Sequence, residues 1–249
     1  MSGHSKWATI KHKKGAADVK RGKLFAKLIR QVEVAAKNGG GDPDMNPNLR
    51  TMFQKARDAS VPIDTIERAI KRGTGELEGV VYEEVNYEGY AGHGVAVFVE
   101  TLTDNRNRTG PEMRSTFSKL GGSIAEPGAV AWQFERKGVI IVPGSVDEDE
   151  IMMAALDAGA DDVSREGDNW SITCEATVTS MVRTALEEAG YKVESSDLTM
   201  VPQSLIELDD LAAVKSVLRL IDALEENDDV QDVYANFDIP DALMAELEA

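Results

Sequence analysis

The sequence predicts an α+β protein of several domains: an N-terminal three-helix bundle, an α+β domain, and a ferredoxin-like βαββαβ domain inserted in it. Three observations lead to this prediction. Up to residue 72, apolar residues recur with helical spacing. After the Gly-rich break at 72–79, short alternating segments typical of strands appear between helices. From 138 to 203 these segments follow the order strand, helix, strand, strand, helix, strand.

Three helices are expected in the first 72 residues. The segment 17–38 has one apolar helix face, formed by Phe25, Leu28, Ile29, Val32 and Ala36. A second helix is expected to begin where Asn46 caps it and Pro47 occupies its first turn. For the third helix, the spacing of Asp64 and Glu67 predicts a capping box, and Gly73 predicts its end. The bundle with its basic N-terminal arm is predicted to span 1–79.

The α+β domain is assigned to residues 80–135 together with 204–240. Strands are predicted at 81–90, 94–103 and 129–135, with a helix over 111–122 between them. The segment 208–227 predicts a further helix, and 230–239 a last strand. Glycines at 89, 92 and 94 lie around the junction of the first two strands, and we interpret this stretch as a hairpin turn. We assign these two stretches to one domain because the inserted unit separates them in the chain.

The inserted domain is predicted to span 136–203. Its strands are expected at 138–143 and 191–201, with a hairpin formed by 161–167 and 170–176. Its two helices are expected within 146–159 and 177–190. Cys174 lies in the alternating hairpin segment, which predicts a buried, unreactive thiol, and a lone cysteine excludes an internal disulfide and any multi-cysteine metal site.

Composition predicts a globular protein with two oppositely charged parts. The chain has 249 residues, 42% hydrophobic and 29% charged. Residues 1–72 contain 16 Lys+Arg and 7 Asp+Glu, a net charge of +9. Residues 73–249 contain 11 Lys+Arg and 37 Asp+Glu, a net charge of −26, and the two parts sum to −17. No apolar run has the length of a membrane span, and no secretory segment is recognised, so we expect a cytoplasmic protein without a membrane partner.

The basic N-terminal segment is the first candidate binding site, with nucleic acid as the predicted partner. A flexible Gly- and Ser-containing arm with many lysines can follow a phosphate backbone, and Trp7 is suited to stack on a base. The basic residues assigned to this site are Lys6, Lys11, Lys13, Lys14, Lys20, Arg21, Lys23, Lys27 and Arg30. The alternative is a solvated tail followed by a solvated helix face.

A second candidate site is the motif LTDNRNRT at 102–109. Thr109 and Glu112 have the spacing of a capping box, which predicts a helix N-terminus here. Arg106 and Arg108 beside that terminus form a candidate clamp for a phosphate or a carboxylate. Pairing of these arginines with the acidic remainder of the chain explains them equally well.

No pattern in the sequence predicts an enzyme, and we expect no cofactor, no metal and no small-molecule substrate. The glycine-rich stretches lack the order and the flanking residues of nucleotide-binding loops. His4, His12 and His93 have no metal-ligand spacing, and the DEDE run at 147–150 has no calcium-loop pattern after it. No serine occupies a nucleophile elbow.

Five separated motifs give the chain a resemblance to a known family. In order along the chain they are MSGHSKWATIKHKKGAADVKRGK, GGGDPDMNPNLR, IERAIKRGTGE, YEGY and LTDNRNRT. They resemble the YebC family, whose mitochondrial relatives are called translational activators of cytochrome c oxidase. The resemblance implies the same three-domain fold. Where the family usually has a Pro-Gly-Gly-like turn after YEGY, this chain has Ala91, Gly92, His93 and Gly94.

The resemblance implies two functions that differ in their nucleic acid. Bacterial members are described as probable transcriptional regulators that bind DNA, whereas other members are similar to translation factors that act on the ribosome and relieve stalling on proline-rich stretches. We favour a ribosome-associated translation factor that contacts rRNA or tRNA. The second hypothesis is a DNA-binding transcriptional regulator, and the third is a protein-binding adaptor that uses the ferredoxin-like domain. The oligomeric state stays open.

Overall fold

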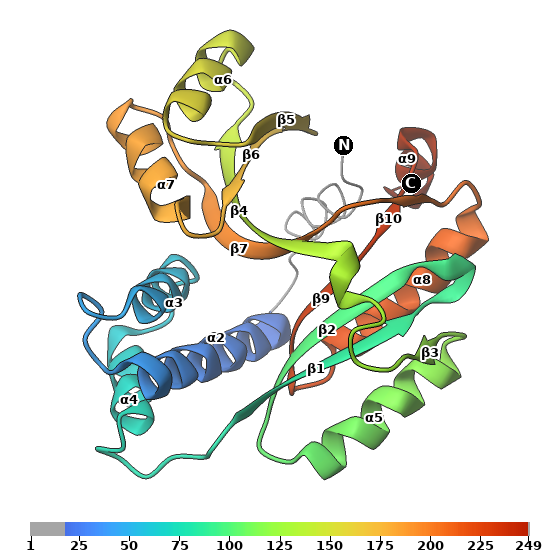
Figure 1. Ribbon diagram of the computed structural model, residues 1–249, viewed down its shortest axis with the longest axis horizontal. Helices are drawn as coiled ribbons and strands as arrows, with labels where there is room; N and C mark the ends of the chain where they lie inside the picture. The colour runs from blue at the N-terminus through green and yellow to red at the C-terminus, as the bar shows by residue number, and fades with distance from the viewer. Residues whose placement is uncertain (1–17, 249) are drawn as a thin grey trace.

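A computed structural model describes the backbone of residues 18–248 and the side chains of residues 22–240 and 242–247. Figure 1 shows three groups of elements: helices α2 to α4, an α+β unit that contains both α5 and α8, and a smaller unit with α6 and α7. The mixture of helices and antiparallel sheets is the α+β class that the sequence predicts. Four separate apolar clusters form the cores, and they share no residue in the part of the chain that the structure describes.

The first group contains α2 (Asp18–Gly39), α3 (Pro47–Asp58) and α4 (Ile63–Gly73). Its core includes Leu28, Val32, Leu49 and Ile66. Asn46 caps α3 as predicted, because its Oδ1 accepts a hydrogen bond from the Leu49 amide at 3.1 Å, while its Nδ2 donates to the Ala35 carbonyl at 2.8 Å. The start of α3 is thereby fixed to the end of α2.

The capping box predicted for α4 is wrong. The helix begins at Ile63 after Pro62, which has no side-chain donor or acceptor with which to cap. Asp64 therefore lies in the first turn, where its negative charge still stabilises the helix dipole.

The α+β unit is built on a four-stranded sheet in the order β3-β1-β2-β9. Its strands are β1 (Glu83–Tyr90), β2 (Ala96–Thr103), β3 (Ser123–Ile124) and β9 (Val230–Ala235), and every neighbouring pair is antiparallel. One face is covered by α5 (Arg106–Lys119) and α8 (Leu211–Glu225), around a core that contains Val97, Met113, Phe117 and Leu220. This sheet brings the end of α8 beside the start of α5.

Smaller elements complete this unit. A 3-10 turn η1 (Gly92–Gly94) closes the predicted β1–β2 hairpin, with His93 in the left-handed region at a φ of 63°. A two-stranded parallel sheet pairs β8 (Ile206–Glu207) with β10 (Phe237–Asp238), and α9 (Asp241–Glu248) follows. The sequence patterns had not predicted β3, β8 or α9, because each is too short for a clear period.

The third group has the element order predicted for the ferredoxin-like unit. It contains β4 (Phe134–Pro143), α6 (Glu148–Asp157), β5 (Asp162–Glu166), β6 (Asn169–Glu175), α7 (Thr179–Glu188) and β7 (Ser195–Pro202). The sheet order is β5-β6-β4-β7, with all pairs antiparallel. Ile140, Ile151, Ile172 and Leu186 lie in its core.

Two predictions about element boundaries are wrong. The strand expected at 129–135 is a 3-10 turn η2 (Ala131–Gln133), and β4 runs without a break from Phe134 to Pro143. The boundary drawn between residues 135 and 136 therefore falls inside one strand, whose first residue, Phe134, pairs with Pro202 of β7. Gly138, the first residue of the strand expected at 138–143, lies inside β4, because it pairs with Cys174 of β6 and with Leu198 of β7.

Candidate nucleic-acid interface

The predicted N-terminal site lies only partly within the structure. Lys6, Trp7, Lys11, Lys13 and Lys14 are outside the described residues, so their assignment stays a prediction. Lys20 and Arg21 are part of α2, but their side chains are also outside the description. The remaining members, Lys23, Lys27 and Arg30, can be placed.

Lys23, Lys27 and Arg30 form one stripe on α2, and all three contact the end of α8. The Lys23 ammonium donates a hydrogen bond to the Glu226 carbonyl at 3.0 Å, and that of Lys27 donates to the Glu225 carbonyl at 3.1 Å. Since α8 ends at Glu225, these oxygens belong to the negative end of a helix, where cations are stabilised. The basic face of α2 is thus in contact with the acidic part of the chain.

Carboxylates of the α8–β9 loop, residues 226–229, add to this contact. Lys23 lies 3.8 Å from the Asp228 carboxylate, and Arg30 lies 3.8 Å from that of Asp229. The Arg30 guanidinium also donates to the Asp228 carbonyl and lies 5.5 Å from the centre of the Tyr82 ring, a cation–π distance. A polar cleft of about 590 Å³ lies at this junction.

The motif at 102–109 surrounds a buried carboxylate on the same loop. Asp229 accepts hydrogen bonds from Arg108 Nη2 at 2.7 Å, Thr109 Oγ1 at 2.7 Å and Thr103 Oγ1 at 3.2 Å. Burial would raise the pKa of Asp229, but the hydrogen bonds from Arg108, Thr109 and Thr103 hold it below its usual value. Arg108 therefore binds a carboxylate, and that carboxylate belongs to the chain itself.

The N-terminus of α5 explains the rest of this motif. The helix starts at Arg106, and Asn105 caps it by accepting from the amides of Asn107 and Arg108. The capping box predicted for Thr109 and Glu112 is wrong, because Thr109 already lies inside the helix. Arg106 is 64% exposed and 3.7 Å from Glu83, a surface pair of small energetic effect.

Sequence reasoning had not singled out Asp229, Glu225 or the carbonyls of 226–228. The available signal was the acidic run EENDD at the end of the helix predicted over 208–227. A run of acids after a helix is usually solvated, so only the placement of α2 beside it reveals its partners.

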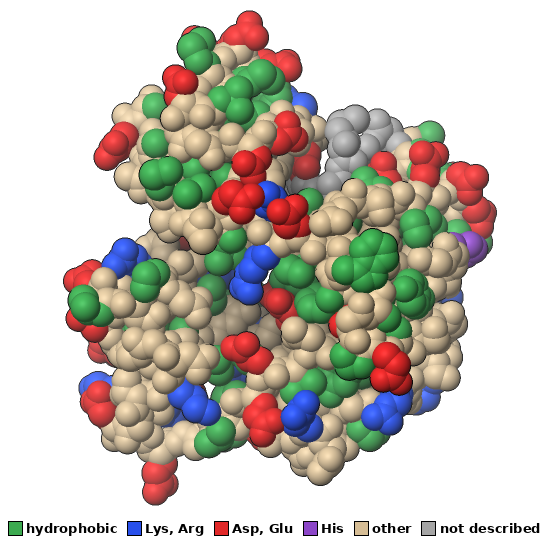
Figure 2. Space-filling view, in the orientation of Figure 1, with side chains coloured by type: hydrophobic (Ala, Val, Ile, Leu, Met, Phe, Trp, Pro, Cys, Tyr) green, Lys and Arg blue, Asp and Glu red, His purple; other side chains and the backbone are tan. Residues whose placement is uncertain are grey.

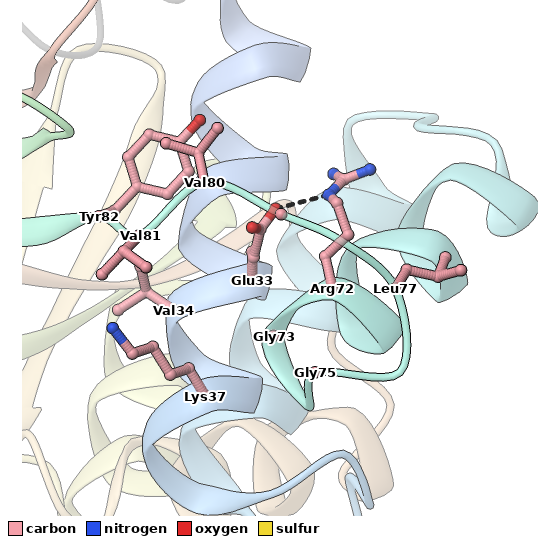
Figure 3. A pocket seen from close by; sticks show the side chains of 11 residues that line it. Glu33, Val34, Lys37, Arg72, Gly73, Gly75, Leu77, Val80, Val81 and Tyr82 are labelled. Carbon is pink, nitrogen blue, oxygen red and sulfur yellow. Dashed lines mark hydrogen bonds and ion pairs between the residues drawn. The ribbon is translucent and has the colours of Figure 1, made fainter.

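A second cavity lies where α2 meets α4 and the segment that leads to β1. Figure 3 shows its lining, and its volume is about 270 Å³. The dashed line in Figure 3 joins Arg72 Nε to Glu33 Oε2 at 2.8 Å, and Glu33 is buried. A Cβ on Gly73 would lie 2.3 Å from the Glu33 carbonyl, so this position requires glycine. The pair joins α2 to α4 within the bundle, and residues of the connecting segment 77–82 line the same cavity.

Charge is unevenly distributed over the surface. Figure 2 shows acidic side chains on the upper unit, which contains α6 and α7. Within the described residues no group of three or more His, Cys, Asp or Glu side chains is arranged to hold a metal ion. None of the helices described has the length and apolar character of a membrane span.

Two parts of the chain match descriptions of one protein family. A family described as the TACO1/YebC protein N-terminal domain matches residues 5–76, and one described as the TACO1/YebC second and third domain matches residues 82–237. The chain belongs to the TACO1/YebC family. The resemblance found in the sequence motifs is therefore confirmed, and the two matches meet at the segment that connects α4 to β1.

Relatives cover almost the whole of this TACO1/YebC member. A protein of Rubrobacter xylanophilus is 58% identical over 249 residues, covering 99% of both chains. One of Geobacter sulfurreducens is 55% identical over 247 residues, covering 99% of this chain and all of the relative. Both are named probable transcriptional regulatory protein. A crystal structure of a conserved hypothetical protein from Aquifex aeolicus has a TM-score of 0.86 and 47% identity, and the match covers 94% of this chain and 97% of that one.

Proposed function

We propose that this protein regulates gene expression by binding nucleic-acid phosphates through its first 30 residues, with rRNA or tRNA on the ribosome as the target. On this proposal it assists translation through proline-rich stretches. The observation that carries the proposal is the segregation of charge, +9 in residues 1–72 against −26 in residues 73–249. A cationic end attracts a polyanion, and the anionic remainder is repelled from it.

The contacts of α2 favour phosphate binding over reading of base edges. A helix that reads DNA lies in the major groove with its polar face against the bases. On α2 that face presents Lys23, Lys27 and Arg30, which contact the end of α8 and offer charge rather than amide pairs suited to adenine. The more N-terminal lysines can make the first phosphate contacts without using these three side chains.

The acidic units also favour a compact RNA target over a long duplex. Charges within a Debye length of about 8 Å at physiological salt interact strongly. A long duplex that passes the acidic units would be repelled, whereas a short cationic segment entering an RNA-lined cavity keeps those units outside. The effect on translation would come from positioning RNA, since no catalytic side chain is assigned.

A DNA-binding regulator is the second candidate. It is favoured by the names of the relatives, which are called probable transcriptional regulatory proteins. The same positive charge supports it, because phosphate contacts do not distinguish DNA from RNA without base or 2′-hydroxyl contacts.

Sedimentation with ribosomes at 50 and 200 mM salt tests the proposal. The variant replaces Lys11, Lys13 and Lys14 with Gln, and a matched control makes the same charge change at the exposed Lys119, Lys192 and Lys215. The plot of log affinity against log salt has a negative slope, and losing three phosphate contacts should make that slope shallower by about 2. Binding should also weaken at least tenfold. The control should bind like the unmodified protein.

Two results would overturn the translation proposal. If the N-terminal variant binds ribosomes as well as the control does, the basic segment is not the binding site, and a protein-binding adaptor is favoured. If the unmodified protein stays unbound to ribosomes but protects a defined sequence of duplex DNA from cleavage, the DNA-binding candidate replaces the first.

A further inference from the structure

The contact between α2 and the end of α8 has the chemistry of a phosphate site that is already filled. We use the term α2–α8 contact for Lys23, Lys27 and Arg30 together with residues 225–229. The three cations are seven residues apart from first to last, which corresponds to roughly 10 Å along the helix. Their partners are carbonyl and carboxylate oxygens at the negative end of a helix. Phosphate oxygens offer the same kind of acceptor.

The α2–α8 contact is accessible to water and salt. The side chains of Lys23 and Asp228 are 47% and 73% exposed, whereas those of Arg30 and Asp229 are 22% and 7% exposed, so the lysine end is the accessible part of the contact. Exposed ion pairs are individually weak and are screened by salt. A polyanion can therefore compete with the loop for these cations.

The other described ion pairs between the bundle and its neighbours are polar contacts between partly exposed side chains. Lys55 of α3 lies 3.0 Å from Asp197 of β7, and Asp58 lies 3.9 Å from Arg183 of α7. The apolar core of the bundle shares no described residue with the other cores. A shift of the bundle thus exchanges ion pairs and leaves each buried core intact.

We propose that residues 225–229 act as an internal competitor for RNA phosphate, so that RNA binding displaces them from α2 and moves the bundle relative to the α+β unit. This inference rests on the proposed function and adds a regulatory step to it. While the loop covers α2, the apparent affinity for RNA is the intrinsic affinity multiplied by the fraction of molecules in which the contact is open. Weakening the loop side of the contact should then strengthen RNA binding.

The first measurement is the affinity for total ribosomal RNA in a filter-binding assay. Asp228→Asn removes the exposed carboxylate near Lys23 and leaves α2 unchanged. We expect it to bind about three- to fivefold more tightly than the unmodified protein. Asp209→Asn is the matched control, since it removes one exposed carboxylate just before α8, at the opposite end of that helix from the loop. Its affinity should stay within twofold of the unmodified protein.

The second measurement is the distance between the bundle and the α+β unit. Thr65 of α4 and Ala212 of α8 are exposed and uncharged, so cysteines at these positions can carry spin labels without a change of charge. Cys174 is buried and stays unlabelled. We expect the distribution of distances between the labels to shift when ribosomal RNA is added.

Both results are needed, and each can fail separately from the proposed function. If Asp228→Asn binds like Asp209→Asn, or if the label distance stays unchanged with RNA, the competitor is overturned. The proposed function still stands in that case, provided that binding depends on Lys11, Lys13 and Lys14. If the unmodified protein binds no ribosomal RNA, the competitor is overturned, and if it also stays unbound to ribosomes, the proposed function is wrong as well.

Discussion

Replacement of Asp229 by Asn is the sharpest test of the network that joins the 102–109 motif to the α8–β9 loop. The carboxylate is 7% exposed and accepts from Arg108, Thr109 and Thr103. Hydrogen bonds to a charged group contribute about 1.5–3 kcal/mol each. The Asn side chain keeps one acceptor oxygen, but its NH2 group would face the donors that now bind the second carboxylate oxygen. Because Arg108 is 44% exposed and can be rehydrated, we expect a net loss of about 2 kcal/mol in the free energy of unfolding.

The pH dependence gives this prediction its sign. The pKa of Asp229 is below the ordinary 3.8 in the folded protein, so the carboxylate stabilises the fold above that pH. This stabilisation is lost as the pH falls through the folded pKa. The gap between Asp229→Asn and the unmodified protein should therefore be constant from pH 7 to pH 5 and narrow below 3.8.

Urea unfolding followed by circular dichroism at pH 7, 5, 4 and 3 measures that gap. Asp209→Asn serves as a control and should stay within about 0.5 kcal/mol, as surface substitutions usually do. A loss below 0.5 kcal/mol for Asp229→Asn at pH 7, or a gap that does not change with pH, would refute the network as a source of stability.

Three further predictions concern other buried groups. The Glu88 carboxylate accepts hydrogen bonds from the backbone amides of residues 128, 130 and 131 at 2.6–2.7 Å. Glu88→Gln should therefore lower the free energy of unfolding by about 1–3 kcal/mol. An unchanged melting temperature would contradict this prediction. A Cβ on Gly138 would lie 1.9 Å from Thr179 Oγ1. Gly138→Ala should therefore lower the free energy of unfolding, measured in urea, by about 1–3 kcal/mol. Gly92→Ala is the control and should be tolerated, because a Cβ on Gly92 would have no atom within 4 Å. Cys174 is buried, and burial raises the pKa of its thiol. The thiol should therefore react with a thiol reagent at pH 8 only after urea is added. Modification of the folded protein would contradict this and show that the core around Cys174 opens.

Long, periodic elements were predictable from the chain itself. The apolar stripe of α2, the Asn46 cap and the strand and helix order of residues 138–203 each depend on neighbours within a few turns, and the structure has them. Boundaries were less predictable where tertiary pairing extends an element. Strand β4 continues through Gly138 because both of its edges are hydrogen-bonded.

The candidate site was predictable in its residue types and not in their partners. Lys23, Lys27 and Arg30 were identified by their charge, and Arg108 as a clamp for an anion. Their partners lie about 120 to 200 residues further along the chain, in the loop after α8. No local pattern carries that pairing, since it depends on how the sheet places α8 beside both α5 and α2.

The amino-acid order alone determined the family, the helical start and mixed class of the fold, and the division into a cationic head and an anionic remainder. These properties follow from residue types and short-range periods. Only the tertiary structure decided that the basic face of α2 is in contact with the end of α8, and that the arginine motif holds Asp229. The physical reason is that an ion pair is defined by distance in space, and this distance is set by the packing of β-strands and helices remote from one another in the chain.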